Sequence, residues 1–240
     1  MTTMNQVTMT EPQATAPTPQ PRPARTAVRV VALALLAGSV LFGATPSARA
    51  GAQAEEQLAP SVVAGLSKAI ADRPVPGDHA SQPAVRAWLD DMSRRLALRM
   101  PDARERNDFL TTVHYEAQRA GLDPQLVLSV IHHESGFKKY AVSVADARGY
   151  MQVMPFWVRL IGSSDQNLFN LRTNLRYGCT ILRHYLDREN GDLYRALGRY
   201  NGSLGQPQYP SAVVAAWTRH WHYDAPATRV GAAPASTLTR

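Results

Sequence analysis

Apolar residues recur at helical spacing from residue 83 onward. Two early stripes show the pattern, namely Val85, Leu89, Met92 and Leu96, followed by Phe109, Val113, Ala117 and Ala120. Residues three or four positions apart lie on one face of a helix, so each stripe predicts a helix with one buried side. The sequence has no alternating apolar run long enough to demand a β-sheet. The pattern therefore predicts a single all-α domain over residues 83–223.

Capping residues and helix breakers divide the remaining pattern into further helices. Asp123-Pro124 is an N-cap followed by proline at the first helical position. Pro155 opens a short helix, residues 171–186 form the longest amphipathic run, and Asp192 caps the next helix. The apolar positions behind these predictions and behind a last helix are Leu126, Val127, Val130, Ile131, Leu193, Ala196, Leu197, Tyr200, Val213, Val214, Trp217 and Trp221.

Residues 1–50 have the features of a polar, disordered arm followed by a secretory signal peptide. The apolar run over residues 30–44 is shorter than the roughly 20 residues that a membrane-spanning helix needs. Ala48-Arg49-Ala50 then supplies the small-x-small pattern of a cleavage site. We expect cleavage after Ala50 and a periplasmic or secreted protein. The alternative is an uncleaved run that anchors the protein in the membrane, facing the periplasm.

Two other segments lack a helical stripe of useful length. Residues 51–82 are weakly patterned and are interrupted by Pro74, Pro76 and Gly77, so we expect a flexible linker there. Residues 224–240 are expected to form a disordered tail.

Composition sets the size and the charge of the molecule. The 240 residues are 45% hydrophobic, which suffices for one domain with a real core. Lys and Arg number 26 against 19 Asp and Glu, a formal net charge of +7. An excess of this sign suits a polyanion such as nucleic acid, an anionic membrane or an anionic cell-wall polymer. The sequence has no nucleic-acid-binding motif, so we expect no nucleic acid partner.

Cysteine and histidine give no sign of redox or metal chemistry. Cys179 is the one cysteine, and its place in the stripe over residues 171–186 favours a buried core residue over a reactive thiol. His133-Glu134 begins like a zinc-protease helix, but that motif needs a second histidine where this chain has Phe137. We therefore expect no metal and no cofactor.

Glu134 is the candidate for chemistry. It follows Ile131 by three residues and Val130 by four, so helical geometry places it on the apolar face. Gly136 should end the helix, which puts a carboxylate at a C-terminal end where the helix dipole opposes it. Desolvation raises the pKa of a carboxyl group, and a protonated carboxyl can act as a general acid. A surface glutamate remains the alternative on these grounds alone.

Several ordered motifs around Glu134 resemble the soluble lytic transglycosylase family, whose catalytic domain is similar to goose-type lysozyme. The resemblance covers about residues 105–205. It is carried by Glu134-Ser135-Gly136-Phe137, Ser143, Ala147-Arg148-Gly149-Tyr150-Met151-Gln152-Val153-Met154-Pro155, Asn167-Leu168-Phe169-Asn170, Asn174, Gly178, Ala196-Leu197 and Tyr200-Asn201-Gly202. Together these motifs are specific, although each alone is weak.

The resemblance implies an enzyme that cleaves peptidoglycan between N-acetylmuramic acid and N-acetylglucosamine and leaves 1,6-anhydro ends. It implies that Glu134 is the acid and then the base, and that Tyr200 hydrogen-bonds and orients it. The substrate-binding residues that it implies are Ser143, Gly149, Tyr150, Met151, Gln152, Met154, Tyr200 and Asn201. We expect a monomer that binds glycan strands, with a cell-envelope or secretion-apparatus protein as a further candidate partner.

Three departures from the family pattern leave room for a different activity. Asp146 stands where the family usually has glycine, Tyr150 where it has leucine, and Asn201-Gly202-Ser203 replaces Asn-Ala-Gly. Asp146 could be a second carboxylate, which would make the protein a lysozyme-like hydrolase. Two further functions fit the same motifs: a glycan-binding scaffold that does not cut, and a wall-opening accessory factor of a secretion or conjugation apparatus.

Overall fold

The computed structural model describes residues 53–71 and 78–224. All of them belong to one compact unit, Thr45–Arg240. The predictions of a disordered arm and signal peptide over residues 1–50 lie outside the described residues, as does the predicted tail from residue 225 onward.

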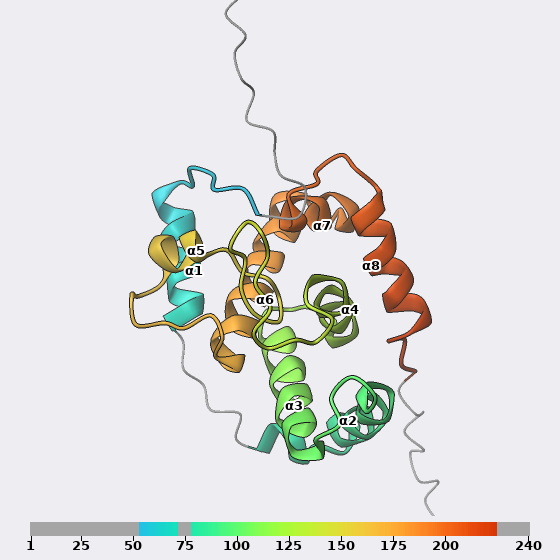
Figure 1. Cartoon of the computed structure of the whole chain (residues 1–240). Helices are drawn as coiled ribbons and strands as arrows, with labels where there is room; N and C mark the ends of the chain where they lie inside the picture. Colours follow the sequence, from blue (N-terminus) through green and yellow to red (C-terminus); the bar gives the residue numbers. More distant parts are fainter. Residues whose placement is uncertain (1–52, 72–77, 225–240) are drawn as a thin grey trace, which may run out of the picture. The chain divides into compact units, whose positions relative to one another are not determined.

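The described residues form eight α-helices and one short 3-10 helix (Figure 1). The helices are α1 (Pro60–Ala71), η1 (Asp78–Ser81), α2 (Pro83–Leu96), α3 (Ala103–Arg119), α4 (Pro124–Glu134), α5 (Pro155–Ile161), α6 (Leu171–Arg188), α7 (Leu193–Asn201) and α8 (Gln208–Arg219). These residues contain no β-strand and only two isolated bridges, Val142 with Arg148 and Arg148 with Val153. The all-α prediction is confirmed.

The capping signals act as the sequence predicts. The Asp123 side chain accepts a hydrogen bond from the Gln125 backbone N–H at 2.7 Å and so begins α4. Asp192 does the same for α7 through the Arg195 N–H at 3.0 Å. Each cap satisfies a backbone donor that has no partner inside the helix.

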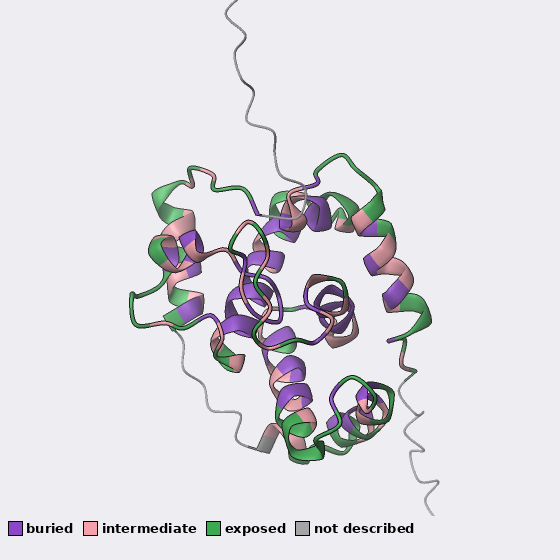
Figure 2. Cartoon of the chain, in the orientation of Figure 1, coloured by how far each residue is buried: buried purple, intermediate pink, exposed green. Residues whose placement is uncertain are grey.

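Helix α6 lies at the centre of the packing. It contacts α1, α3 and α7, and residues 174–182 are buried without interruption (Figure 2). This stretch includes the small residues Gly178 and Cys179, and its buried polar side chains Asn174 and Arg176 have hydrogen-bond or ion-pair partners. Cys179 is a fully buried core residue, as its position predicts.

Helix α1 corrects the prediction of a flexible linker over residues 51–82. Leu66 and Ile70 from this helix are buried in the core, and α1 contacts α5 and α6. Val62, Leu66 and Ile70 repeat every four residues, which is a helical stripe. The prediction was wrong here because the prolines and glycine at residues 74–77 interrupt the chain only after this helix has ended.

The long segment between α4 and α5, residues 135–154, passes over α6, and one side chain of that helix bonds its backbone. Asn174 of α6 is fully buried and accepts a hydrogen bond from the Met151 N–H at 2.8 Å. Its amide also donates to the carbonyl oxygens of Arg148 at 2.8 Å and Leu168 at 2.9 Å. A segment without regular structure keeps its backbone polar groups satisfied in this way.

No helix among the described residues has the length and apolar character needed to cross a membrane.

Candidate active site

Glu134 is the last residue of α4, and its carboxyl group is held from two other helices. Tyr209 of α8 donates its hydroxyl to Glu134 Oε1 at 2.5 Å. Asn201, at the end of α7, also hydrogen-bonds the carboxyl group. Helix α8 packs on both α4 and α7, which brings these three side chains together.

Burial makes Glu134 a weaker acid than an exposed glutamate. Desolvation raises its pKa from 4.5 to about 7, and the hydrogen bonds from Tyr209 and Asn201 oppose part of that rise. Glu134 as a whole is half-buried, so it keeps some surface exposed to solvent. A carboxyl group in this state can hold a proton near neutral pH and release it to a bound molecule.

Tyr209 takes the role that the sequence reasoning assigned to Tyr200. The Tyr200 hydroxyl is buried and donates to the Met151 carbonyl oxygen at 2.8 Å, not to Glu134. Tyr209 lies beyond the motifs that carry the resemblance, and a tyrosine between Gln208 and Pro210 gave no signal of its own. Tyr200 instead ties α7 to the segment that contains Met151.

Ser143 is partly exposed, and its hydroxyl is engaged within its own loop. The Ser143 Oγ accepts hydrogen bonds from the backbone N–H groups of Ala145 at 3.2 Å and Ala147 at 3.1 Å. These contacts fix the turn that carries Asp146. The hydroxyl proton is not used in either bond, so it is free to be donated to another acceptor.

The fold of the protein requires a glycine at position 149. Its φ is +76°, and a Cβ there would lie 2.4 Å from the Asn174 Nδ2 and 2.6 Å from the Leu168 carbonyl oxygen. These contacts account for the glycine without a role in substrate binding, which is the role that the family resemblance implies for it. Any larger residue would displace the Asn174 side chain that holds the loop.

Three of the expected substrate-binding residues are largely buried. Met151 is fully buried against α6, and its Sδ occupies the space that a side chain at Gly178 would need. Tyr150 is 2% exposed and its ring lies 4.8 Å from that of Phe109. Gln152 is 6% exposed and donates to the carbonyl oxygens of Ala141 and Gly149. Their buried side chains support the loop over residues 135–154 from the interior of the protein.

Met154 and Asn201, like Ser143, are expected binding residues that retain exposed surface. Met154 is half-buried at the N-cap of α5, and Asn201 is half-buried beside Glu134. The structure thus brings Tyr200, Asn201 and Glu134 into one cluster, and Tyr200 links that cluster to residues 151–154. Ser143 and Tyr150 belong to other parts of the same loop.

Asp146 does not have the environment of a second catalytic carboxyl group. Its side chain is 56% exposed and forms an ion pair with Arg148 at 2.9 Å. Its φ is +67°, so it fills a position in the left-handed region where the family's usual glycine is favoured.

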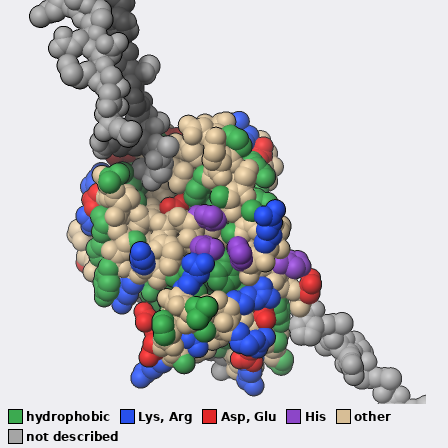
Figure 3. Space-filling model, turned by 45° about the vertical axis from the view of Figure 1, so that its right-hand side comes forward, with side chains coloured by type: hydrophobic (Ala, Val, Ile, Leu, Met, Phe, Trp, Pro, Cys, Tyr) green, Lys and Arg blue, Asp and Glu red, His purple; other side chains and the backbone are tan. Residues whose placement is uncertain are grey.

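His132 and His133 immediately precede Glu134. Figure 3 shows histidine side chains gathered on one face of the molecule, with lysine and arginine side chains close to them. The rings of His132 and His133 are stacked at 5.2 Å, and His220 lies 5.9 Å from His132. Desolvation, with smaller contributions from Arg99 and the other two histidines, lowers the pKa of His132 to about 4. Within residues 53–71 and 78–224, no three His, Cys, Asp or Glu side chains are arranged to hold a metal ion.

Comparison with known proteins finds a family match over the part of the chain that holds these residues. Residues 111–211, which include Glu134, Asn201 and Tyr209, match the family model described as the transglycosylase SLT domain. This part of the chain is similar to a transglycosylase SLT domain. The family resemblance drawn from the motifs is therefore confirmed.

Relatives that match this part of the chain are named as transglycosylases. A protein named transglycosylase from Enterobacteria phage PRD1 is 33% identical over 98 residues, covering 41% of this chain and 36% of the phage protein. Membrane-bound lytic murein transglycosylase C of Haemophilus influenzae strain PittEE is 45% identical over 113 residues, covering 40% of this chain and 32% of that protein. The chain thus spans about a third of the length of these relatives.

A solved structure also matches part of the chain. It is an inactive mutant of lytic transglycosylase Slt from Pseudomonas aeruginosa, 26% identical over 48% of this chain and 19% of its own, with a TM-score of 0.39.

Proposed function

We propose that this protein is a peptidoglycan lytic transglycosylase. The observation that carries the proposal is Glu134, a poorly solvated carboxyl group with a pKa of about 7 that is oriented by Tyr209 and Asn201. The SLT domain and the names of its relatives support the same substrate class. A scaffold that binds glycan without cutting it would have no need of an acid held in this state.

The reaction proposed has one carboxyl group acting twice. Glu134 gives its proton to the glycosidic oxygen between N-acetylmuramic acid and N-acetylglucosamine, and the bond from C1 to that oxygen breaks. The substrate's own N-acetyl oxygen can stabilise the positive charge that develops at C1. The C6 hydroxyl of the same sugar then attacks C1, and its proton returns to Glu134. Because this attack is intramolecular, positioning replaces an external nucleophile.

The environment of Asp146 favours this route over hydrolysis. Retaining and inverting glycosidases place a second carboxyl group about 5 Å or about 6.5–9.5 Å from the first. Asp146 is exposed and engaged with Arg148, so it is not poised to act on a sugar. We expect Asp146→Asn to change the rate by less than about tenfold, the scale of a minor electrostatic contact.

Digestion of purified sacculi in ¹⁸O water tests the proposal. Mass spectrometry of the soluble products should show 1,6-anhydro-muramoyl ends without the label. Glu134→Gln should lower the rate by about 10²–10⁴-fold, the usual scale for general acid–base help. Labelled muramic acid ends together with an inactive Asp146→Asn variant would identify a hydrolase instead. Glu134→Gln activity within a few-fold of the parent would remove Glu134 from the mechanism.

We also propose that the protein acts outside the cytoplasm, with its chain beginning at Gly51. The support is the short apolar run over residues 30–44 and the Ala48-Arg49-Ala50 pattern that follows it. N-terminal sequencing of the exported protein should begin at Gly51. Recovery of an intact run in the membrane fraction would contradict this and favour the anchored form.

A further inference from the structure

Gln53 is a buried polar residue that lies outside the matched domain, before α1. The residue as a whole is only 5% exposed. The amide oxygen accepts a hydrogen bond from the Met154 N–H at 3.1 Å, and the amide nitrogen donates to the Gln152 carbonyl oxygen at 3.2 Å. One amide thus satisfies the backbone on both sides of Val153, as a neighbouring strand would.

The same side chain reaches the helix that contacts Glu134. Gln53 hydrogen-bonds the Tyr200 hydroxyl, which itself donates to the Met151 carbonyl oxygen at 2.8 Å. Tyr200 immediately precedes Asn201, one of the two side chains bound to Glu134. Gln53 therefore lies where residues 151–154 meet α7.

A second anchor holds the segment around Gln53 in place. Glu56 forms ion pairs with Arg188 at the end of α6 and with Arg199 of α7, the latter at 3.3 Å. Residues 53–59 run from these contacts into α1, beside α7 in Figure 1. Two fixed points three residues apart leave Gln53 little freedom to withdraw.

We propose that Gln53 is a positioning residue that fixes residues 151–154 against α7 and thereby sets the affinity for glycan. The proposal rests on the proposed function, because the substrate is the glycan named there. None of these Gln53 hydrogen bonds involves the Glu134 carboxyl group. It should therefore act on substrate binding and leave the protonation of Glu134 alone.

Binding measured without cleavage tests this directly. In the full chain carrying Glu134→Gln, calorimetry with a soluble tetrasaccharide of alternating N-acetylglucosamine and N-acetylmuramic acid should give a Kd that rises about 5–20-fold on adding Gln53→Met, which is similar in size and has no amide to hydrogen-bond. Gln53→Asn is a second variant, because its amide is too short to reach both backbone groups and it should also weaken binding. Glu55→Gln is the matched control, because Glu55 is exposed and pairs only with the exposed Arg159 at 3.6 Å.

Kinetics of the active chain separate positioning from a merely structural role. Gln53→Met should raise KM for the same oligosaccharide at a temperature well below its Tm, while the fall in activity near pH 7 stays where it is in the parent. A Kd within twofold of the parent for both variants, or an altered pH limb, would overturn the proposal. If the Glu134→Gln parent itself binds no oligosaccharide, the proposed function fails, which is a different result from equal binding by parent and variant.

Discussion

At the scale of single residues, the state of Glu134 is a compromise between burial and hydrogen bonding. Burial favours the neutral acid, whereas the bonds from Tyr209 and Asn201 favour the anion, and burial dominates. The burial of Glu134 therefore lowers the stability of the folded protein at the pH where its carboxyl group ionises.

Glu134→Gln should stabilise the protein above neutral pH. The pKa of Glu134 is about 7 in the folded protein against an ordinary 4.5, so the native state is penalised as pH rises from about 4.5 to about 7. The amide removes this penalty of about 1–3 kcal/mol, which is discounted because the residue is partly exposed. Thermal unfolding should show a gain at pH 8 that nearly vanishes at pH 4.5. The same gain at both pH values would contradict the assignment, and Glu55→Gln serves as the exposed control.

Tyr209→Phe should move the pH dependence of cleavage. Loss of the hydroxyl removes a hydrogen bond that lowers the pKa of Glu134, so that pKa should rise and the alkaline limb of activity should shift to higher pH. The maximal rate should fall about 3–30-fold, because the carboxyl group loses the contact that orients it. Rates on sacculi between pH 5 and pH 9 measure both effects. Tyr194→Phe, on the exposed face of α7, should change neither.

At the scale of elements, the loop over residues 135–154 depends on Asn174. Its three hydrogen bonds reach the N–H of Met151 and the carbonyl oxygens of Arg148 and Leu168. The requirement for glycine at residue 149 follows from the same side chain, since a Cβ would collide with it. One asparagine on the central helix thus holds the loop that leads from Ser143 to Met154.

Asn174→Leu should destabilise the fold by about 3–5 kcal/mol, because it keeps the volume and leaves the Met151 N–H and the Leu168 carbonyl oxygen without partners, whereas the Arg148 carbonyl oxygen keeps the bond from the Val153 N–H. Asn174→Asp should lie between this variant and the parent, since its carboxylate still accepts from the Met151 N–H. Urea unfolding followed by circular dichroism gives the comparison. A leucine variant as stable as the parent would show that water or a backbone shift replaces these bonds.

The sequence predicted much of this element-scale picture and missed specific parts of it. Helices after residue 83 could be located because apolar spacing and the caps Asp123 and Asp192 act locally. Glu134 could be found because its place on an apolar face is itself unusual. Tyr209 and Gln53 could not be found, because their roles depend on α8 and on the N-terminal segment packing against distant residues.

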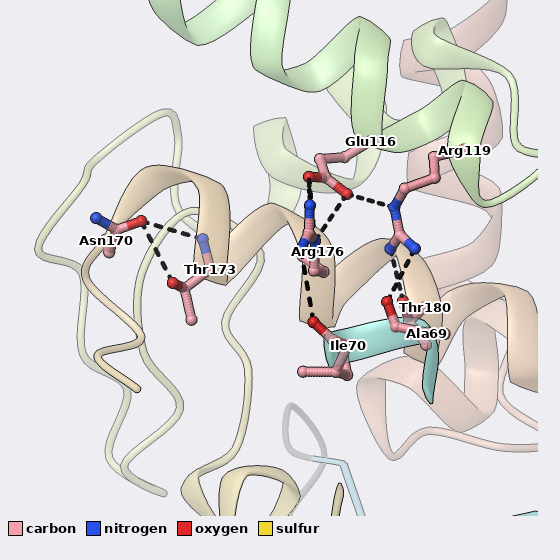
Figure 4. A network of polar contacts seen from close by, with 8 residues as sticks. All are labelled: Ala69, Ile70, Glu116, Arg119, Asn170, Thr173, Arg176 and Thr180. Carbon is pink, nitrogen blue, oxygen red and sulfur yellow. Dashed lines mark hydrogen bonds and ion pairs between the residues drawn. The ribbon is translucent and has the colours of Figure 1, made fainter. Parts of the chain in front are cut away.

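At the scale of the whole molecule, one buried carboxylate connects three helices. Glu116 of α3 is fully buried and forms ion pairs with Arg119 at 2.7 Å and with Arg176 of α6 at 2.9 Å (Figure 4). Arg119 also donates to the Ala69 carbonyl oxygen at 2.9 Å and Arg176 to that of Ile70 at 3.5 Å. Both carbonyls belong to the last turn of α1, where a helix has acceptors without internal partners.

This network gives α1 a polar attachment in addition to its apolar face. A partner protein that bound residues 60–71 as a detached segment would have to break both the polar attachment and the apolar packing of α1. These residues are therefore poorly suited to bind a partner in that way. Deleting residues 51–82 to search for a partner would remove α1 from the core, and a variant confined to the exposed face of α1 is the better probe.

Glu116→Gln should loosen α1 before the rest of the fold. Removing one partner of a buried ion pair costs about 3–5 kcal/mol, because the two arginines are then left without their counter-charge. Arg119 and Arg176 would separate, and the carbonyls of Ala69 and Ile70 would lose their donors. Hydrogen exchange should therefore rise first in residues 60–71, at denaturant concentrations where α4 remains protected. Asp187→Asn removes the exposed pair with Arg183 and should cost no more than about 1 kcal/mol. Uniform loss of protection across α1 and α4 would show instead that Glu116 stabilises the whole domain and not the attachment of α1.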